Sequence, residues 1–140
     1  MRVLRYALLI IVFFLSYWAG YYSYESALWL VWKQTLGGDK RAVLFWTSIA
    51  YLIILVPLFL LVCYTIKSKL KSKLPRFVSY PIFCASACIL PTAFIMLFLG
   101  GGSFFSAESL LFCSFFASSG ISFGLGYGLI SLMFEPKSME

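Results

Sequence analysis

The sequence predicts an all-α integral membrane protein with four transmembrane helices in a compact bundle, and three observations lead to this fold class. Hydrophobic residues make up 62% of the chain, well above the roughly 45–50% of soluble globular domains. Charged residues make up only 11%, which is too few to cover a water-exposed surface. The apolar residues also gather in four runs without aspartate, glutamate, lysine or arginine: 6–24, 42–66, 77–99 and 110–134.

A helix needs about 20 predominantly apolar residues to cross the hydrocarbon core of a bilayer, and each run is of this order. A chain of 140 residues has room for one domain, so residues 1–140 are expected to form a single four-span membrane domain. The first run follows Arg2 and Arg5 as a signal peptide would. It continues into aromatic residues without a small-residue cleavage pattern, and we interpret it as a membrane anchor and the first span.

The loop between the first two runs, residues 25–41, predicts a short helix in the membrane interface. Residues 25–36, ESALWLVWKQTL, can form about three helical turns, ended by the two glycines that follow. Tryptophan prefers the headgroup level, and all four tryptophans lie around this hairpin end: Trp18, Trp29, Trp32 and Trp46. Two interpretations stay open: an aromatic belt, or a surface of Trp29, Trp32 and Glu25 that binds a toxin or another partner.

The distribution of basic residues predicts the orientation, because lysine and arginine favour the cytoplasmic side. If the N-terminus is inside, eight basic residues lie inside: Arg2, Arg5, Lys67, Lys69, Lys71, Lys73, Arg76 and Lys137. Three lie outside: Lys33, Lys40 and Arg41. Both termini are therefore expected in the cytoplasm of a bacterium, with the protein in the inner membrane. Lys40 and Arg41, next to the second span, argue against this orientation.

Residues 66–76, IKSKLKSKLPR, form a basic linker between the second and third runs. As an extended strip, its lysines would all reach lipid phosphates, at about 1 kcal/mol per residue near an anionic leaflet: Lys67, Lys69, Lys71 and Lys73. Anionic lipids at the cytoplasmic face are therefore predicted partners. The alternative is a cytoplasmic stop that only fixes the topology.

Pro57 and Pro91 lie in the middle of the second and third runs. Proline lacks an N–H and crowds the preceding turn, so each predicts a kink. Such a kink serves packing or forms a transport hinge, since broken helices line the binding sites of transporters. Both interpretations stay open.

No catalytic, cofactor-binding or metal-ligating residue is expected. The chain has no histidine, the commonest metal ligand and a frequent general base. Its acidic residues lie in loops or in the tail: Glu25, Asp39, Glu108, Glu135 and Glu140. The four cysteines fall within apolar runs, where a free thiol behaves as a small hydrophobe. The basic residues lie in short stretches and form no single face, which argues against nucleic-acid binding.

The fourth run carries a glycine-zipper pattern. Gly120, Gly124 and Gly128 recur every four residues and so lie on one side of a helix. A second stripe of small residues runs beside them: Ser114, Ser118, Ser122 and Gly126. Small residues let two backbones approach closely in a membrane. The pattern predicts a helix-packing seam, with three alternatives: packing within this chain, packing against another protein, or a pore wall.

These features favour a small non-enzymatic protein that acts through helix–helix binding to another membrane component. An accessory subunit of a complex is one form. A protector of the immunity type, which neutralises a membrane-inserting toxin, is another. The alternative is a small oligomeric channel or transporter for a neutral or hydrophobic solute, with a filter built from backbone carbonyls and hydroxyls.

Overall fold

The computed structural model describes residues 2–100, 103 and 105–134, and their regular elements are all helical. In chain order these are α1 (Arg2–Trp32), η1 (Gly37–Asp39), α2 (Lys40–Ala50), η2 (Tyr51–Leu55), α3 (Val56–Lys69), α4 (Lys73–Ser86), α5 (Ile89–Ile95), η3 (Met96–Gly100) and α6 (Ala107–Phe134). Lys137, Glu135 and Glu140, used above, lie outside the described residues.

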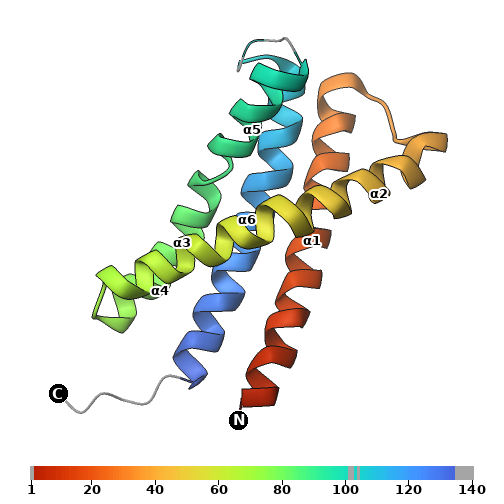
Figure 1. Cartoon of the computed structure of the whole chain (residues 1–140). Coiled ribbons are helices and arrows are strands. Elements are labelled where there is room, and N and C mark those ends of the chain that lie inside the picture. Colours follow the sequence, from red (N-terminus) through yellow and green to blue (C-terminus); the bar gives the residue numbers. More distant parts are fainter. Residues whose placement is uncertain (1, 101–102, 104, 135–140) are drawn as a thin grey trace.

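Among the described residues, four helices are long and apolar enough to cross a membrane, and each contains one of the four predicted runs or most of it: Val3–Trp32, Gly37–Lys69, Leu74–Phe98 and Ala107–Phe134. The second span combines α2, η2 and α3, and the third combines α4, α5 and η3. The start of α1 and the end of α6 lie at the same end of the molecule (Figure 1).

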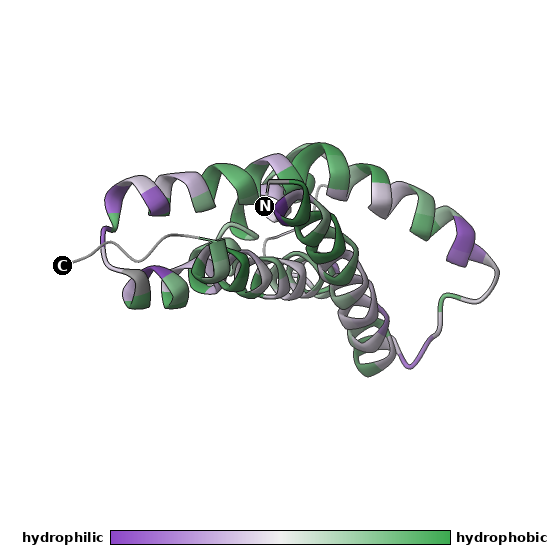
Figure 2. Cartoon of the chain, turned by 90° about the horizontal axis from the view of Figure 1, so that it is seen from below, coloured by the Kyte–Doolittle hydropathy of each residue, from purple (hydrophilic) through white to green (hydrophobic). Residues whose placement is uncertain are grey.

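The packing is less regular than a bundle of four aligned helices. α6 lies between α1 and α4 and makes its most extensive contacts with these two. The second span crosses the other helices obliquely, and its α2 end runs out beyond them (Figures 1 and 2). Hydrophilic residues mark the two ends of this span, with hydrophobic residues between them (Figure 2).

The core forms where the second span crosses α1 and α6. Three aromatic rings stack there, with Phe123 of α6 between Phe13 of α1 and Phe59 of α3. The ring centroids lie 5.5 Å and 5.3 Å from that of Phe123. Phe59 and Phe123 are fully buried. This stack fixes the second span across the face of the other helices.

The prediction of a separate interfacial helix after the first span is wrong. Residues 25–32 continue α1 without a break, because they contain no glycine or proline and are mostly compatible with a helix. The chain leaves the helix at Lys33, which has a left-handed φ of 56° and donates its N–H to the Trp29 carbonyl at 2.9 Å. Gly37, expected to end this helix, instead begins the single turn η1.

Both predicted proline irregularities are present. The third span breaks between α4 and α5, because Pro91 has no N–H for the Ala87 carbonyl, and Leu90 donates to that carbonyl instead at 3.3 Å. In the second span the π-helical turn η2 precedes Pro57. A third proline, Pro81, lies inside α4, and the helix continues past it to Ser86.

Candidate functional site

The glycine stripe of α6 lies against α4. A Cβ on Gly120 would lie 2.5 Å from the Cys84 carbonyl oxygen, and one on Gly124 would lie 2.5 Å from the Cα and N of Pro81. Real Cβ atoms do not approach backbone so closely, so only glycine permits this contact. Gly128 continues the stripe, with the ring of Phe77 2.8 Å from its Cβ position.

The second stripe of small residues lies against α1. The Ser118 hydroxyl donates to the Ala19 carbonyl at 3.3 Å, and a Cβ on Gly126 would lie 2.6 Å from the methyl groups of Val12. Ser122 lies between them on the same helical face by its spacing. The two stripes therefore hold α6 between α1 and α4 of the same chain.

Hydroxyl groups connect α1 to the second span. Tyr51 hydrogen-bonds to Ser16 and donates to the Phe13 carbonyl at 3.2 Å. One turn further, the Tyr17 hydroxyl lies 3.0 Å from that of Thr47. Because lipid tails offer no hydrogen bonds, these contacts specify how the two helices meet.

Replacing Tyr51 with phenylalanine is expected to lower the unfolding free energy by about 1 kcal/mol. The variant loses the hydrogen bonds of the Tyr51 hydroxyl, and interhelical hydrogen bonds in membrane proteins contribute about this much. Thermal unfolding in mild detergent measures the change. Tyr64→Phe is the matched control, because Tyr64 is 74% exposed on the same span. Equal destabilisation by both variants would contradict a specific role for Tyr51.

The four cysteines are unbridged. The Sγ atoms of Cys63 and Cys84 lie 3.8 Å apart, which is a contact between α3 and α4 without a covalent bond. The Cys113 thiol points to the Thr92 hydroxyl at 3.5 Å. Among the described residues, no three histidine, cysteine, aspartate or glutamate side chains are grouped to hold a metal ion.

The basic linker is not an extended strip, which corrects the sequence-based expectation. Lys67 and Lys69 lie in the last turn of α3, and Lys73 begins α4. Lys67, Lys69 and Lys71 are exposed at this turn, and their contact with lipid phosphates stays a prediction. The side chain of Lys73 lies outside the described part of the chain.

Arg76 differs from these lysines because it is buried, with 9% of its surface exposed. Its Nε donates to the Leu70 carbonyl at 3.0 Å, and its Nη2 donates to the Lys71 carbonyl at 2.9 Å. The guanidinium group therefore holds the turn between α3 and α4. No local sequence pattern separates Arg76 from the neighbouring lysines.

The predicted partner surface lies on the last turns of α1. Glu25 and Trp29 line one side of an open hollow of about 490 Å³, whereas Trp32 does not line it. The Lys33 ammonium lies 4.3 Å from the centroid of the Trp29 ring, a favourable cation–π contact. The structure thus brings Glu25 and Trp29 together, with half of the Trp29 surface exposed.

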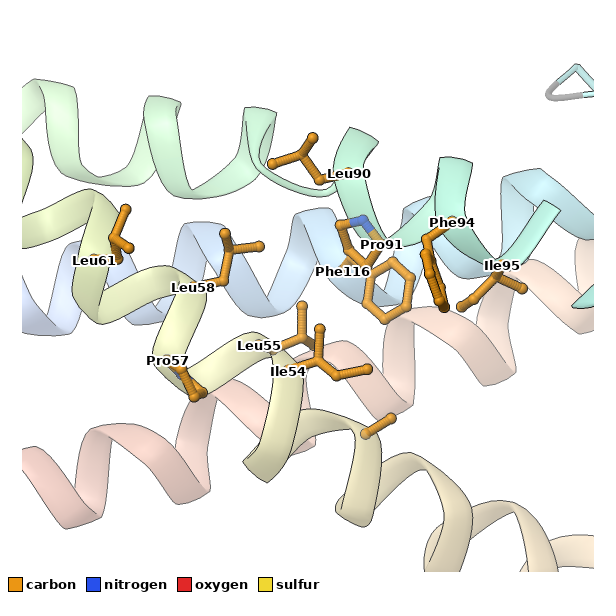
Figure 3. A pocket seen from close by; sticks show the side chains of 11 residues that line it. Ile54, Leu55, Pro57, Leu58, Leu61, Leu90, Pro91, Phe94, Ile95 and Phe116 are labelled. Carbon is orange, nitrogen blue, oxygen red and sulfur yellow. The ribbon is translucent and has the colours of Figure 1, made fainter. Parts of the chain in front are cut away.

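An apolar cleft that the sequence did not predict lies between the second span and α5, and we name it the α3–α5 cleft. It has a volume of about 390 Å³. Leu90, Pro91 and Phe94 of α5 face Ile54 and Leu58 of the second span across it, and Phe116 of α6 lies behind them (Figure 3). Pro57 also lines this cleft, so both span-breaking prolines belong to the same cleft.

A second cleft of about 390 Å³ opens on the other side of Ala50, between α2 and α6, and we name it the α2–α6 cleft. Tyr24 of α1 and Trp46 of α2 line it together with Phe112 and Phe115 of α6. The two clefts share residues Ala50, Ile95 and Phe116. They adjoin each other where the oblique second span diverges from α5 and α6.

These features define the class of protein, a multi-pass helical membrane protein with two adjoining apolar clefts along an oblique second span. No protein-family model, no curated protein and no solved structure matches the chain. The function is therefore argued from the chemistry of these sites.

Proposed function

We propose that this protein is non-enzymatic and acts by helix–helix binding to another membrane component, as an accessory subunit or as an immunity-type protector against a membrane-inserting toxin. The observation that carries the proposal is the α3–α5 cleft. Helices pack by placing the side-chain ridges of one into the grooves of another, and this cleft is such a groove. The small-residue stripes of α6 already pack against α1 and α4.

The dimensions of the cleft suit a crossing helix. Its wall on the second span runs from Ala50 to Leu61, which is about 17 Å along a helix, or three turns. The opposite wall is irregular near Pro91, and irregular helical turns occur frequently at functional sites. The lining is almost entirely apolar, which matches a partner segment buried in lipid.

Site-specific photocrosslinking in native membranes tests the proposal. A photoreactive residue at Leu58 or at Phe94, on opposite walls of the cleft, is expected to give the same discrete protein adduct. The control is Leu125, which is partly exposed on α6 and does not line the cleft. Lipid adducts alone at Leu58 and Phe94, or the same protein adduct from Leu125, would contradict helix binding in the cleft.

A second candidate function is a small channel or transporter for a neutral or hydrophobic solute. It is favoured by the two prolines that line one cleft, since broken helices surround the binding sites of transporters. Flux in proteoliposomes and the oligomeric state in mild detergent discriminate the two functions. A monomer that recovers a partner but carries no solute would favour helix binding.

The proposal also includes the location: a bacterial inner membrane, with both termini in the cytoplasm. Support comes from the excess of basic residues on the side that contains the linker between α3 and α4. Reporter fusions after Phe134 and at Ser103 are expected on opposite sides of the membrane, with the one after Phe134 inside. An outside location for the fusion after Phe134 would reverse the orientation.

A further inference from the structure

The α2–α6 cleft has the chemistry of a site for a lipid acyl chain. Its surface is almost entirely apolar, and its volume is about 390 Å³. A cavity of roughly 150 Å³ holds one benzene molecule, so on that scale the cleft accommodates roughly fifteen carbon atoms. The cleft is open on one side, which lets a chain enter from the surrounding bilayer.

The depth of the cleft fits one leaflet. On α2 its lining extends from Ala42 to Ala50, which is about 12 Å along a helix. One leaflet contributes about 15 Å to the hydrocarbon core, half of its total thickness of about 30 Å. The aromatic residues Tyr24 and Trp46 line the cleft, and such residues are enriched where hydrocarbon meets the headgroups.

Two cations lie at the end of α2 where the lining of this cleft begins. Lys40 and Arg41 directly precede Ala42, and both are exposed. In the described part of the chain neither forms an ion pair. The exposed Asp39 precedes them, so the three side chains together carry a charge of +1. A phosphate group at this end of α2 would therefore meet a net positive charge next to the first lining residue of an apolar cleft.

We propose that the α2–α6 cleft holds one acyl chain of an anionic phospholipid whose phosphate contacts Lys40 and Arg41. The positive charge at the start of α2 and the length of the cleft support this occupant. The inference does not rest on the proposed function, which concerns the adjoining α3–α5 cleft. It also gives a role to the basic pair that argues against the proposed orientation: these side chains bind lipid in the outer leaflet.

Lipid retention tests the proposal. The full chain is reconstituted in phosphatidylcholine bilayers that contain a minor fraction of phosphatidylglycerol and is then transferred to mild detergent. Native mass spectrometry measures the lipids that stay bound to each chain. The wild-type chain is expected to retain phosphatidylglycerol preferentially. Lys40→Gln with Arg41→Gln should reduce this preference about 30-fold, as expected for two basic residues at a membrane surface.

Two matched controls distinguish lipid binding in this cleft from the effects of total charge and of added side-chain volume. Lys69→Gln with Lys71→Gln removes the same charge at the other end of the second span. Lipid phosphates are also expected there, but the lining of neither cleft extends to these lysines, so this variant should reduce the preference much less. Ala42→Phe narrows the cleft and should reduce the retention of either lipid, whereas Ile53→Phe, at an exposed position, should not.

Three results would overturn the lipid site: unchanged preference in the Lys40 and Arg41 variant, equal loss in the Lys69 and Lys71 variant, or full retention in Ala42→Phe. A wild-type chain that leaves the bilayer without bound phosphatidylglycerol would also overturn it. None of these results bears on the crosslinks from Leu58 and Phe94, so the two proposals fail separately.

Discussion

Replacing Gly124 with leucine is expected to give the largest loss of stability of any single substitution in the fourth span. The Cβ position of Gly124 lies 2.5 Å from backbone atoms of Pro81, and a backbone cannot rotate away as a side chain can. The α4 and α6 helices must therefore separate along the whole stripe. Overpacking in a core costs about 1–3 kcal/mol, and we expect the upper end of this range.

Thermal unfolding in mild detergent measures this effect, with Leu125→Ala as the control at the adjacent, partly exposed position. A sharper comparison is Gly124→Ala against Gly126→Ala, because both add one methyl group. At Gly126 the obstacle is the Val12 side chain at 2.6 Å, which can shift, so this variant should be less damaging. If Gly124→Leu changed neither stability nor assembly, the close contact with α4 would be incidental.

Replacing Arg76 with glutamine is expected to destabilise the protein by about 3 kcal/mol. Two hydrogen bonds from its guanidinium group to the carbonyls of Leu70 and Lys71 would be lost or weakened, and bonds to a charged group contribute about 1.5–3 kcal/mol each. Lysine at this position should restore only part of the loss, since a compact ammonium cannot reproduce the planar fork of arginine.

The control for Arg76 is Lys71→Gln in the same turn. Lys71 is exposed, and surface substitutions usually change the unfolding free energy by less than about 0.5 kcal/mol. Both variants remove one positive charge, so thermal unfolding compares the hydrogen bonds directly. Equal effects from the two variants would mean that Arg76 acts only through its charge.

The four spans could be predicted from the sequence because hydrophobicity and length are local properties. The true length of α1 could not be predicted in this way. The polar residues after Tyr24 end the apolar run, but the helix continues through them. The face shared by Gly120 and Gly124 follows from helical periodicity, but the neighbouring helix does not. The two clefts depend on how the second span crosses the others, which is a long-range property that no local pattern carries.

The oblique second span has a consequence for the membrane that surrounds it. The span is helical from Lys40 to Lys69, and its uncharged run, residues 42–66, is about 37 Å long, whereas a hydrocarbon core is about 30 Å thick. A helix with such a hydrophobic mismatch tilts, and its tilt changes with bilayer thickness. We expect a thinner bilayer to favour the inclined crossing. A thicker bilayer should reduce the tilt of the second span and align it more closely with the other helices. The width of both clefts therefore depends on the length of the lipid chains.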